Sequence, residues 1–106
     1  MNKGVTSLLL TALSTPAVPT EFALAQNYPN PFNPVTTIHY ELPQESFVTL
    51  KLYNLLGQTA AVLLNEKKEA GRYKVKWDAS MMPSGVYFYK VQAGKFTDIK
   101  KMLLIR

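Results

Sequence analysis

The sequence predicts an all-β chain, folded as an immunoglobulin-like antiparallel β-sandwich of about seven short strands. Apolar side chains recur at every second position in most segments, which is the period of a strand with one buried face. Turn-forming residues interrupt this alternation about every 10 residues, a spacing typical of sandwiches. No segment carries the 3.6-residue period of a long amphipathic helix.

Composition limits the chain to one domain and narrows its function. The 106 residues are 47% hydrophobic and 18% charged, a balance that indicates one globular core. The net charge of +5 falls short of the clustered basic charge that is typical of nucleic-acid-binding proteins. A nucleic acid is therefore not expected as a partner. The absence of cysteine excludes disulfides and cysteine-ligated zinc. No stretch reaches the roughly 20 apolar residues of a transmembrane helix.

Residues 1–22 are predicted to be a leader or linker that precedes a domain over residues 23–106. Lys3 comes before a short apolar run over 5–13, and Ala23-Leu24-Ala25 has the small-x-small form of a signal-peptidase site. A weak secretory signal peptide is therefore one interpretation. Prolines and a glutamate interrupt the approach to that site, so a linker, or the end of a longer chain, is the other.

The domain is expected to open with a stiff, turn-rich segment over residues 26–34. Three prolines in six residues fix the backbone and push the residues before them toward extended geometry. The asparagines of this segment can bond their own backbone two residues on. Tyr28 and Phe32 are the expected anchors of the segment in the core.

After this segment, six strands are expected over residues 35–42, 47–54, 59–64, 72–77, 85–92 and 96–105. The polar stretch 65–71 between the third and fourth is expected to be a loop, in which 66–69 could form one helical turn. The alternation assigns these side chains to the inner faces: Ile38, Tyr40, Leu42, Val48, Leu50, Leu52, Tyr73, Val75, Trp77, Tyr87, Tyr89 and Val91.

No catalytic, metal or cofactor site is predicted, and the chain is expected not to be an enzyme. The sole histidine, His39, falls on the outward face of its strand with no histidine or cysteine nearby to complete a metal site. Asp98 is assigned to the outward pattern of the last strand. Asp78 is expected to bond backbone N–H groups of the following loop, as far as Ser80. Neither a nucleophile elbow nor a phosphate-binding glycine loop is present.

Five motifs follow one another in the sequence, at residues 24–38, at 48–58, at 70–80, at 83–90 and at 100–106. In this order they resemble the type A C-terminal sorting domains of the type IX (Por) secretion system. The residues that carry the resemblance, and are expected to be structural, are Asn27, Pro29, Asn30, Pro31, Phe32, Asn33, Pro34, Gly57, Gly71, Tyr73, Trp77, Asp78, Ser84, Gly85, Tyr87 and Tyr89.

The resemblance implies a targeting function. Such a domain folds at the end of a cargo protein that has reached the periplasm, and the outer-membrane translocon recognises it. A sortase-like peptidase then commonly removes it, and the cargo reaches the cell surface or the medium. A cargo domain is therefore expected on the N-terminal side, for which 22 residues are too few. We expect either a fragment of a longer protein or a stand-alone copy.

The alternative is a structural immunoglobulin-like module of an extracellular protein, used in adhesion or as a spacer. The opening motif also resembles the immunoglobulin-like domain of flagellar hook-capping proteins. In those proteins the segment after the Trp-Asp pair is typically longer than residues 77–85 here. That shorter segment and the Lys-Met-Leu ending favour the sorting domain.

Recognition by the secretion machinery is assigned to the end of the last strand. Its backbone edge is expected to be available for pairing, and its cations would supply electrostatic complementarity to a receptor. The competing interpretation is that these residues only complete the fold. The residues concerned are Lys100, Lys101, Met102, Leu103, Leu104, Ile105 and Arg106.

Overall fold

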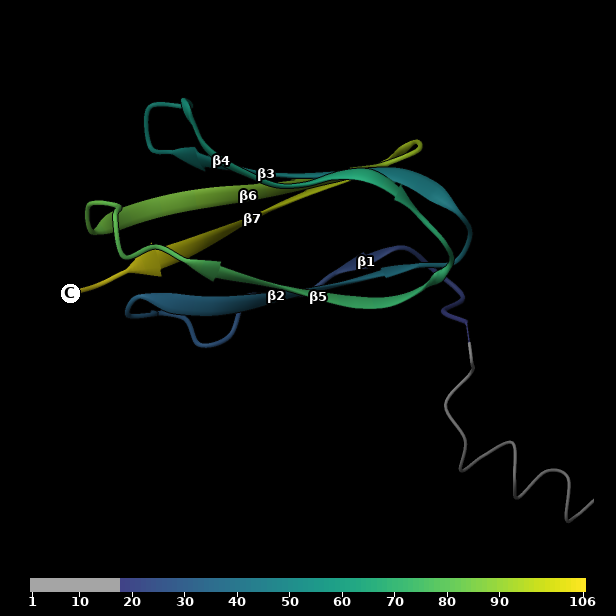
Figure 1. Cartoon of the computed structure of the whole chain (residues 1–106), viewed down its shortest axis with the longest axis horizontal. Coiled ribbons are helices and arrows are strands. Elements are labelled where there is room, and N and C mark those ends of the chain that lie inside the picture. The colour runs from purple at the N-terminus through teal and green to yellow at the C-terminus, as the bar shows by residue number, and fades with distance from the viewer. Residues whose placement is uncertain (1–17) are drawn as a thin grey trace, which may run out of the picture.

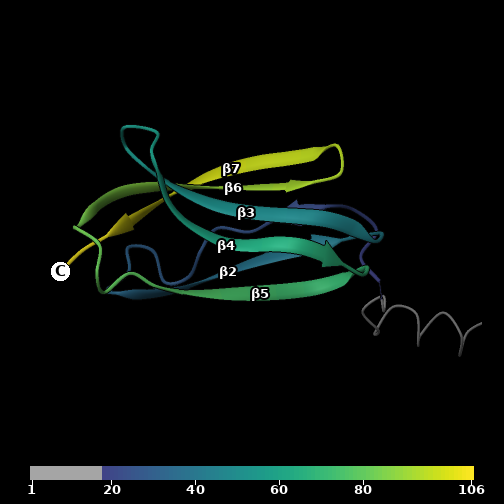
Figure 2. The ribbon, with the colours of Figure 1, turned by 45° about the horizontal axis from the view of Figure 1, so that its top comes forward.

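The structure is a computed structural model and describes residues 18–106. Two antiparallel sheets stack face to face in this part of the chain (Figures 1 and 2). One has the order β1-β2-β5 and the other the order β4-β3-β6-β7. The strands are β1 (Ala23–Leu24), β2 (Val35–Leu42), β3 (Ser46–Asn54), β4 (Thr59–Lys68), β5 (Gly71–Asp78), β6 (Gly85–Ala93) and β7 (Phe96–Leu104). The predicted all-β sandwich is confirmed.

The core lies between the two sheets, where the sequence alternation places it. The inward side chains of β2, β3 and β6 are buried, among them Ile38, Leu50 and Tyr89, each 0% exposed. In β5 Trp77 is buried, whereas Tyr73 and Val75 are half-buried on this edge strand. The chain changes sheet after β2, after β4 and after β5, so strands distant in sequence share one core.

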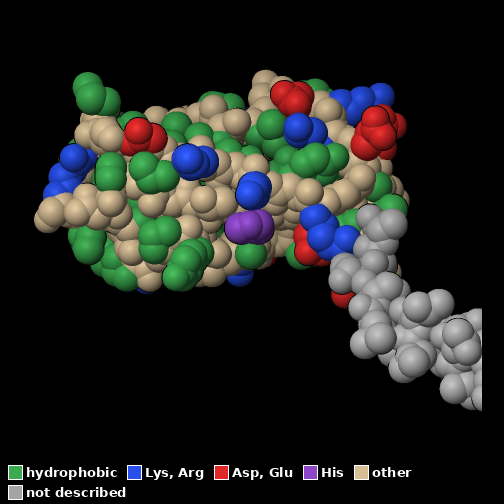
Figure 3. Space-filling view, turned by 60° about the horizontal axis from the view of Figure 1, so that its bottom comes forward, with side chains coloured by type: hydrophobic (Ala, Val, Ile, Leu, Met, Phe, Trp, Pro, Cys, Tyr) green, Lys and Arg blue, Asp and Glu red, His purple; other side chains and the backbone are tan. Residues whose placement is uncertain are grey.

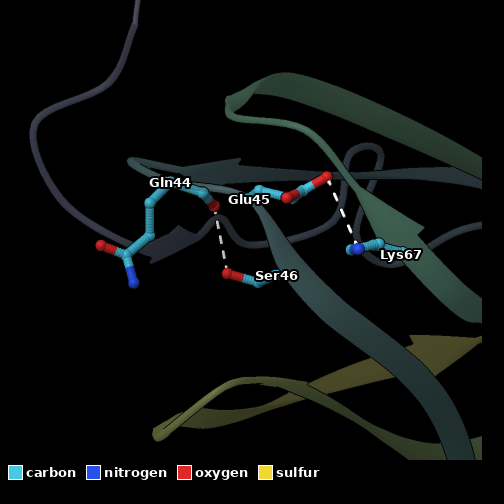
Figure 4. A network of polar contacts seen from close by, with 4 residues as sticks. All are labelled: Gln44, Glu45, Ser46 and Lys67. Atoms are coloured by element: carbon cyan, nitrogen blue, oxygen red, sulfur yellow. Dashed lines mark hydrogen bonds and ion pairs between the residues drawn. The ribbon is translucent and has the colours of Figure 1, made fainter.

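Strand β4 is longer than predicted and continues through the polar stretch to Lys68. The helical turn suggested for 66–69 is wrong, because the ladder to β3 continues through these residues to the pair Ser46↔Lys68. An edge strand tolerates charged side chains since one of its sides is wet. Lys67 contacts Glu45 at 3.9 Å across the pair, beside the bond from Ser46 Oγ to the Gln44 carbonyl (Figure 4).

Strand β1 was not predicted, and it explains the small-x-small tripeptide. Ala23 and Leu24 pair with β2, and the Ala25 N–H donates to the His39 carbonyl at 2.9 Å. Leu24 points into the core and the two alanines point out. The alternation of a short edge strand thus accounts for this pattern. The other part of the suggested signal peptide, Lys3 and the run 5–13, lies outside the described residues.

Two side chains lie on the face opposite to the predicted one. Tyr28 is 78% exposed, because its backbone bridges to Thr37, and cross-strand partners share a face, here the outer one. Asp98 has the buried Val91 as its partner and therefore belongs to the inner face of β7. It is half-buried at the margin, where its Oδ1 accepts the Ile99 N–H at 2.9 Å. Phe32, the other predicted anchor, is 1% exposed.

The described residues contain no helix that is long and apolar enough to cross a membrane.

Candidate functional site

The end of β7 is the predicted recognition segment, and it lies at the edge of the four-stranded sheet. Its pairing with β6 is regular from Gly85↔Leu104 to Ala93↔Phe96. The strand is yellow in Figure 1 and ends beside the loop that joins β5 to β6. Strand β7 has only one neighbour in the sheet, so its second edge decides whether a partner strand can add there.

That second edge is occupied near its end by the segment that follows β1. Gln26 Nε2 donates to the Lys101 carbonyl at 2.7 Å, and Asn30 Oδ1 accepts the Leu103 N–H at 3.0 Å. Phe32 then bonds β7 twice through its backbone: its N–H donates to the Leu103 carbonyl and its carbonyl accepts the Ile105 N–H, both at 2.9 Å. The expected free backbone edge is therefore wrong for residues 101–105.

The seven predicted recognition residues do not form one surface. Met102 and Leu104 are each 1% exposed and belong to the core. Lys100 is half-buried on the inner face, where it lies opposite Tyr89. The remaining four are exposed to solvent: Lys101, Leu103, Ile105 and Arg106.

Arg106 ties the chain end to the loop between β5 and β6. Its Nη2 donates to the carbonyls of Ala79 at 3.0 Å and Ser80 at 2.8 Å, and also to that of Met82. The same loop is braced by Asp78, whose Oδ1 accepts from the Ser80 N–H at 3.0 Å and from its hydroxyl. The predicted role of Asp78 is confirmed, and Arg106 has a structural role beside any role in recognition.

The exposed side chains of β7 remain the accessible part of the segment. Lys101 lies opposite Phe88 on the outer face of the sheet, and Leu103 lies opposite Val86. Leu103 is 38% exposed and Ile105 46%. A shallow hollow of about 160 Å³, lined partly by Asn30, Val86 and Lys101, lies at this junction. The site therefore offers a cation and apolar side chains that a protein partner could cover.

A buried polar network locks the opening segment onto β6. The Tyr89 hydroxyl accepts the Asn27 N–H at 2.8 Å and donates to the Ala25 carbonyl at 2.7 Å. Asn27 Nδ2 donates to Thr36 Oγ1 at 2.9 Å, and that hydroxyl donates to the Pro29 carbonyl at 2.8 Å. Burial raises the pKa of Tyr89 to about 12, so its hydroxyl is protonated at neutral pH.

An aromatic cluster anchors the other end of the same segment. The Phe32 ring lies 5.8 Å from that of Trp77, which meets the Tyr87 ring edge-on at 5.5 Å. The Tyr87 hydroxyl donates to the Pro83 carbonyl at 2.6 Å. The motif residues of the opening segment and of β5 and β6 thus form one structural unit that holds β7 in place.

Residues 26–105 match the model of the family described as "Secretion system C-terminal sorting domain". The chain belongs to this family. It is thus a sorting domain of the type IX secretion system, a family of secretion signals rather than of catalysts, and the resemblance seen in the sequence is confirmed. Membership places its destination at the cell surface or in the extracellular space.

The sorting domain also resembles a solved structure. This is PorZ, described as an essential bacterial surface component of the type-IX secretion system of human oral-microbiomic Porphyromonas gingivalis. The likeness has a TM-score of 0.51 at 24% identity, and it supports the fold alone. It covers 80% of this chain and 11% of the PorZ chain, so the sorting domain matches a small part of that protein. No curated protein sequence matches the chain.

Sequence analysis missed the residues of the sorting domain that occupy the edge of β7. Asn30 was expected to bond its own backbone, but its Oδ1 bonds Leu103, 73 residues away. Gln26 was given no role. The signal in the sequence was the run of amide side chains in this proline-rich segment, since an amide both donates and accepts and can bond backbone groups of a distant strand.

Proposed function

We propose that this sorting domain carries a cargo attached to its N-terminal side from the periplasm to the outer-membrane translocon, and that a sortase-like peptidase removes the domain afterwards. The domain acts by binding, without catalysis of its own. Family membership over residues 26–105 supports this proposal. The domain itself spans about residues 23–106; the ring of Phe22, stacked 5.2 Å from that of Phe96, lies at its boundary.

Recognition uses the exposed side chains of β7 rather than its backbone edge. The observation that carries this proposal is the alternation of buried and exposed side chains at the end of the chain. Met102 and Leu104 are buried, and other residues already bond the backbone edge near them. Lys101, Leu103 and Ile105 remain exposed. Apolar side chains at the end of an edge strand are a liability unless something covers them. A receptor surface with apolar and acidic groups fits them.

Deletion of residues 100–106 does not test this proposal cleanly. It would remove two core side chains and the partners of Phe32, so a loss of export would follow from unfolding alone. The sharper test is the triple variant K101Q/L103S/I105S in a cargo fusion. Each substitution lies on a side chain that is exposed in the structure.

The matched control is the triple variant F47S/V62S/K67Q on β3 and β4. It also removes two exposed apolar side chains and one exposed lysine, at the other margin of the same sheet. We expect the first variant to lose export while the control retains it, with both proteins folded by circular dichroism. Equal export from the two variants would refute recognition by the exposed face of β7.

A further inference from the structure

The outer face of the other sheet has a hollow that lies apart from the recognition surface proposed above. It has a volume of about 380 Å³ and is lined by Tyr28, Thr37, His39, Lys74 and Lys76. Four of these residues form two neighbouring cross-strand pairs of β2 and β5, Thr37↔Lys76 and His39↔Lys74. Tyr28 forms one end of the array, because its N–H and carbonyl both bond the backbone of Thr37, at 2.9 and 3.0 Å.

The charged side chains that line this hollow are all positive. Every side chain that lines it can donate a hydrogen bond and none is a carboxylate. Figure 3 views this face, where the histidine lies beside a Lys or Arg side chain and the acidic side chains lie apart from it. Of the ion pairs among residues 18–106, none includes Lys74 or Lys76.

The nearest carboxylates on this face form their contacts with residues outside the hollow. Glu41 Oε2 lies 3.6 Å from Arg72 Nε, one cross-strand row beyond His39 and Lys74. Asp78, at the opposite end of β5, accepts two hydrogen bonds from Ser80. Two lysines on one face of a strand repel each other, and in the described chain neither lysine forms an ion pair that offsets this cost. Asp78 attracts Lys76 only from the far end of β5, where the charge of Lys76 is the weakest of the causes that lower the pKa of its carboxyl.

Tyr28 adds a second, independent feature. It is the most exposed aromatic side chain of the described residues, at 78%, although the sequence pattern favours a core anchor at this position. Two hydrogen bonds fix the backbone of Tyr28 against β2, so its exposed ring and hydroxyl stand beside cations that form no ion pair, where a ligand could contact them.

We propose that this hollow binds an oxyanion, a carboxylate or a phosphate group, between Lys74 and Lys76. The ammonium groups supply the charge, while the Thr37 hydroxyl and the His39 ring supply further donors. The site lies on the outer face of the three-stranded sheet, away from the exposed residues of β7 on the other sheet. The anion site is therefore separate from the recognition surface proposed above, and each proposal is tested by its own experiment.

The test is titration of the full 106-residue chain at low ionic strength with inorganic phosphate and, separately, with citrate, followed by amide chemical shifts. We expect saturable shifts at residues 37–39 and 74–76, with a dissociation constant on the order of millimolar for a few exposed contacts. The double variant K74Q/K76Q should weaken binding about fivefold or more. A response to phosphate alone, to citrate alone or to both identifies the oxyanion and supports the proposal.

The matched control is K51Q/K90Q, which removes the lysines of a directly opposed pair on the outer face of the four-stranded sheet. This control should leave the titration unchanged. The proposal is overturned if neither anion gives saturable shifts, if K74Q/K76Q binds as the original chain does, or if the two double variants lose binding equally.

Discussion

The hydroxyl of Tyr89 accepts the backbone N–H of Asn27 at 2.8 Å, across 62 residues of sequence. The same hydroxyl donates to the Ala25 carbonyl, so one side chain of β6 satisfies two backbone groups of the opening segment. That segment in turn occupies the edge of β7. The position of β7 therefore depends on a hydrogen bond made elsewhere in the sandwich.

Tyr89→Phe should destabilise the domain by about 1–3 kcal/mol, because it leaves the buried N–H of Asn27 without its acceptor. Urea denaturation followed by circular dichroism measures the change. Tyr53→Phe is the matched control, since Tyr53 is half-exposed, and it should change stability by less than about 0.5 kcal/mol. Equal effects from the two substitutions would contradict the role given to Tyr89.

Alkaline pH should destabilise the domain in a defined window. Burial raises the pKa of Tyr89 and of Tyr40 from the ordinary value of 10.0 to about 12. The unfolded chain ionises first, so this contribution is complete below pH 10 and is lost as pH rises toward 12, by at most about 1.4 kcal/mol per pH unit for each tyrosine. Urea denaturation at pH 9, 10 and 11 measures the slope.

Tyr89→Phe supplies the control for the alkaline effect, because it removes one of the two ionising hydroxyls. Its stability should fall less steeply above pH 10 than that of the original chain. A slope that is unchanged in this variant would assign the alkaline effect to other groups.

Phe32→Ala should cost about 3–5 kcal/mol, because it leaves a cavity beside Trp77 in the core. Trp77 is the sole tryptophan and is 6% exposed, so its fluorescence reports the environment of this ring directly. The control is Tyr28→Ala at the exposed end of the same segment, with an expected change below about 0.5 kcal/mol. A milder effect at Phe32 than at Tyr28 would contradict the assignment of the anchor.

Ser80→Ala should raise the pKa of Asp78. The Ser80 hydroxyl, then the Ser80 backbone N–H and the charge of Lys76, hold the pKa of this carboxyl below its ordinary value of 3.8. Because the pKa is lower in the folded state, the ionised carboxylate stabilises the folded loop at pH values above 3.8. This stabilisation is lost as the pH falls through the pKa of the folded state. Carboxyl NMR titration of both proteins measures the change, and an unaltered midpoint would contradict the bond.

The sequence predicted the faces of the strands because alternation is a local property. Leu50 and Val91 face inward for the same reason that Lys51 and Lys90 face outward. The prediction was wrong for Asp98, which was assigned to the outer face although the buried positions 102 and 104 place it on the inner one. The two-residue period of a strand predicts which face a side chain lies on better than the polarity of a single residue near the end of the strand does.

The partners of the opening segment could not be predicted in the same way. The bonds from Asn27 to Tyr89 and from Leu103 to Asn30 join positions 62 and 73 residues apart. No local period encodes such a pairing, which depends on how the two sheets stack. The family motif marked these residues, but only the fold shows that they hold β7 and occupy the edge expected to be free.

The most direct test of the sorting function is a fusion of residues 18–106 to the C-terminus of a periplasmic reporter, expressed in a bacterium with a type IX secretion system. Surface proteolysis and fractionation then locate the reporter. We predict that the fusion reaches the cell surface or the medium, and that a strain without the translocon retains it in the periplasm. A folded fusion that stays in the periplasm of the intact strain would contradict the account.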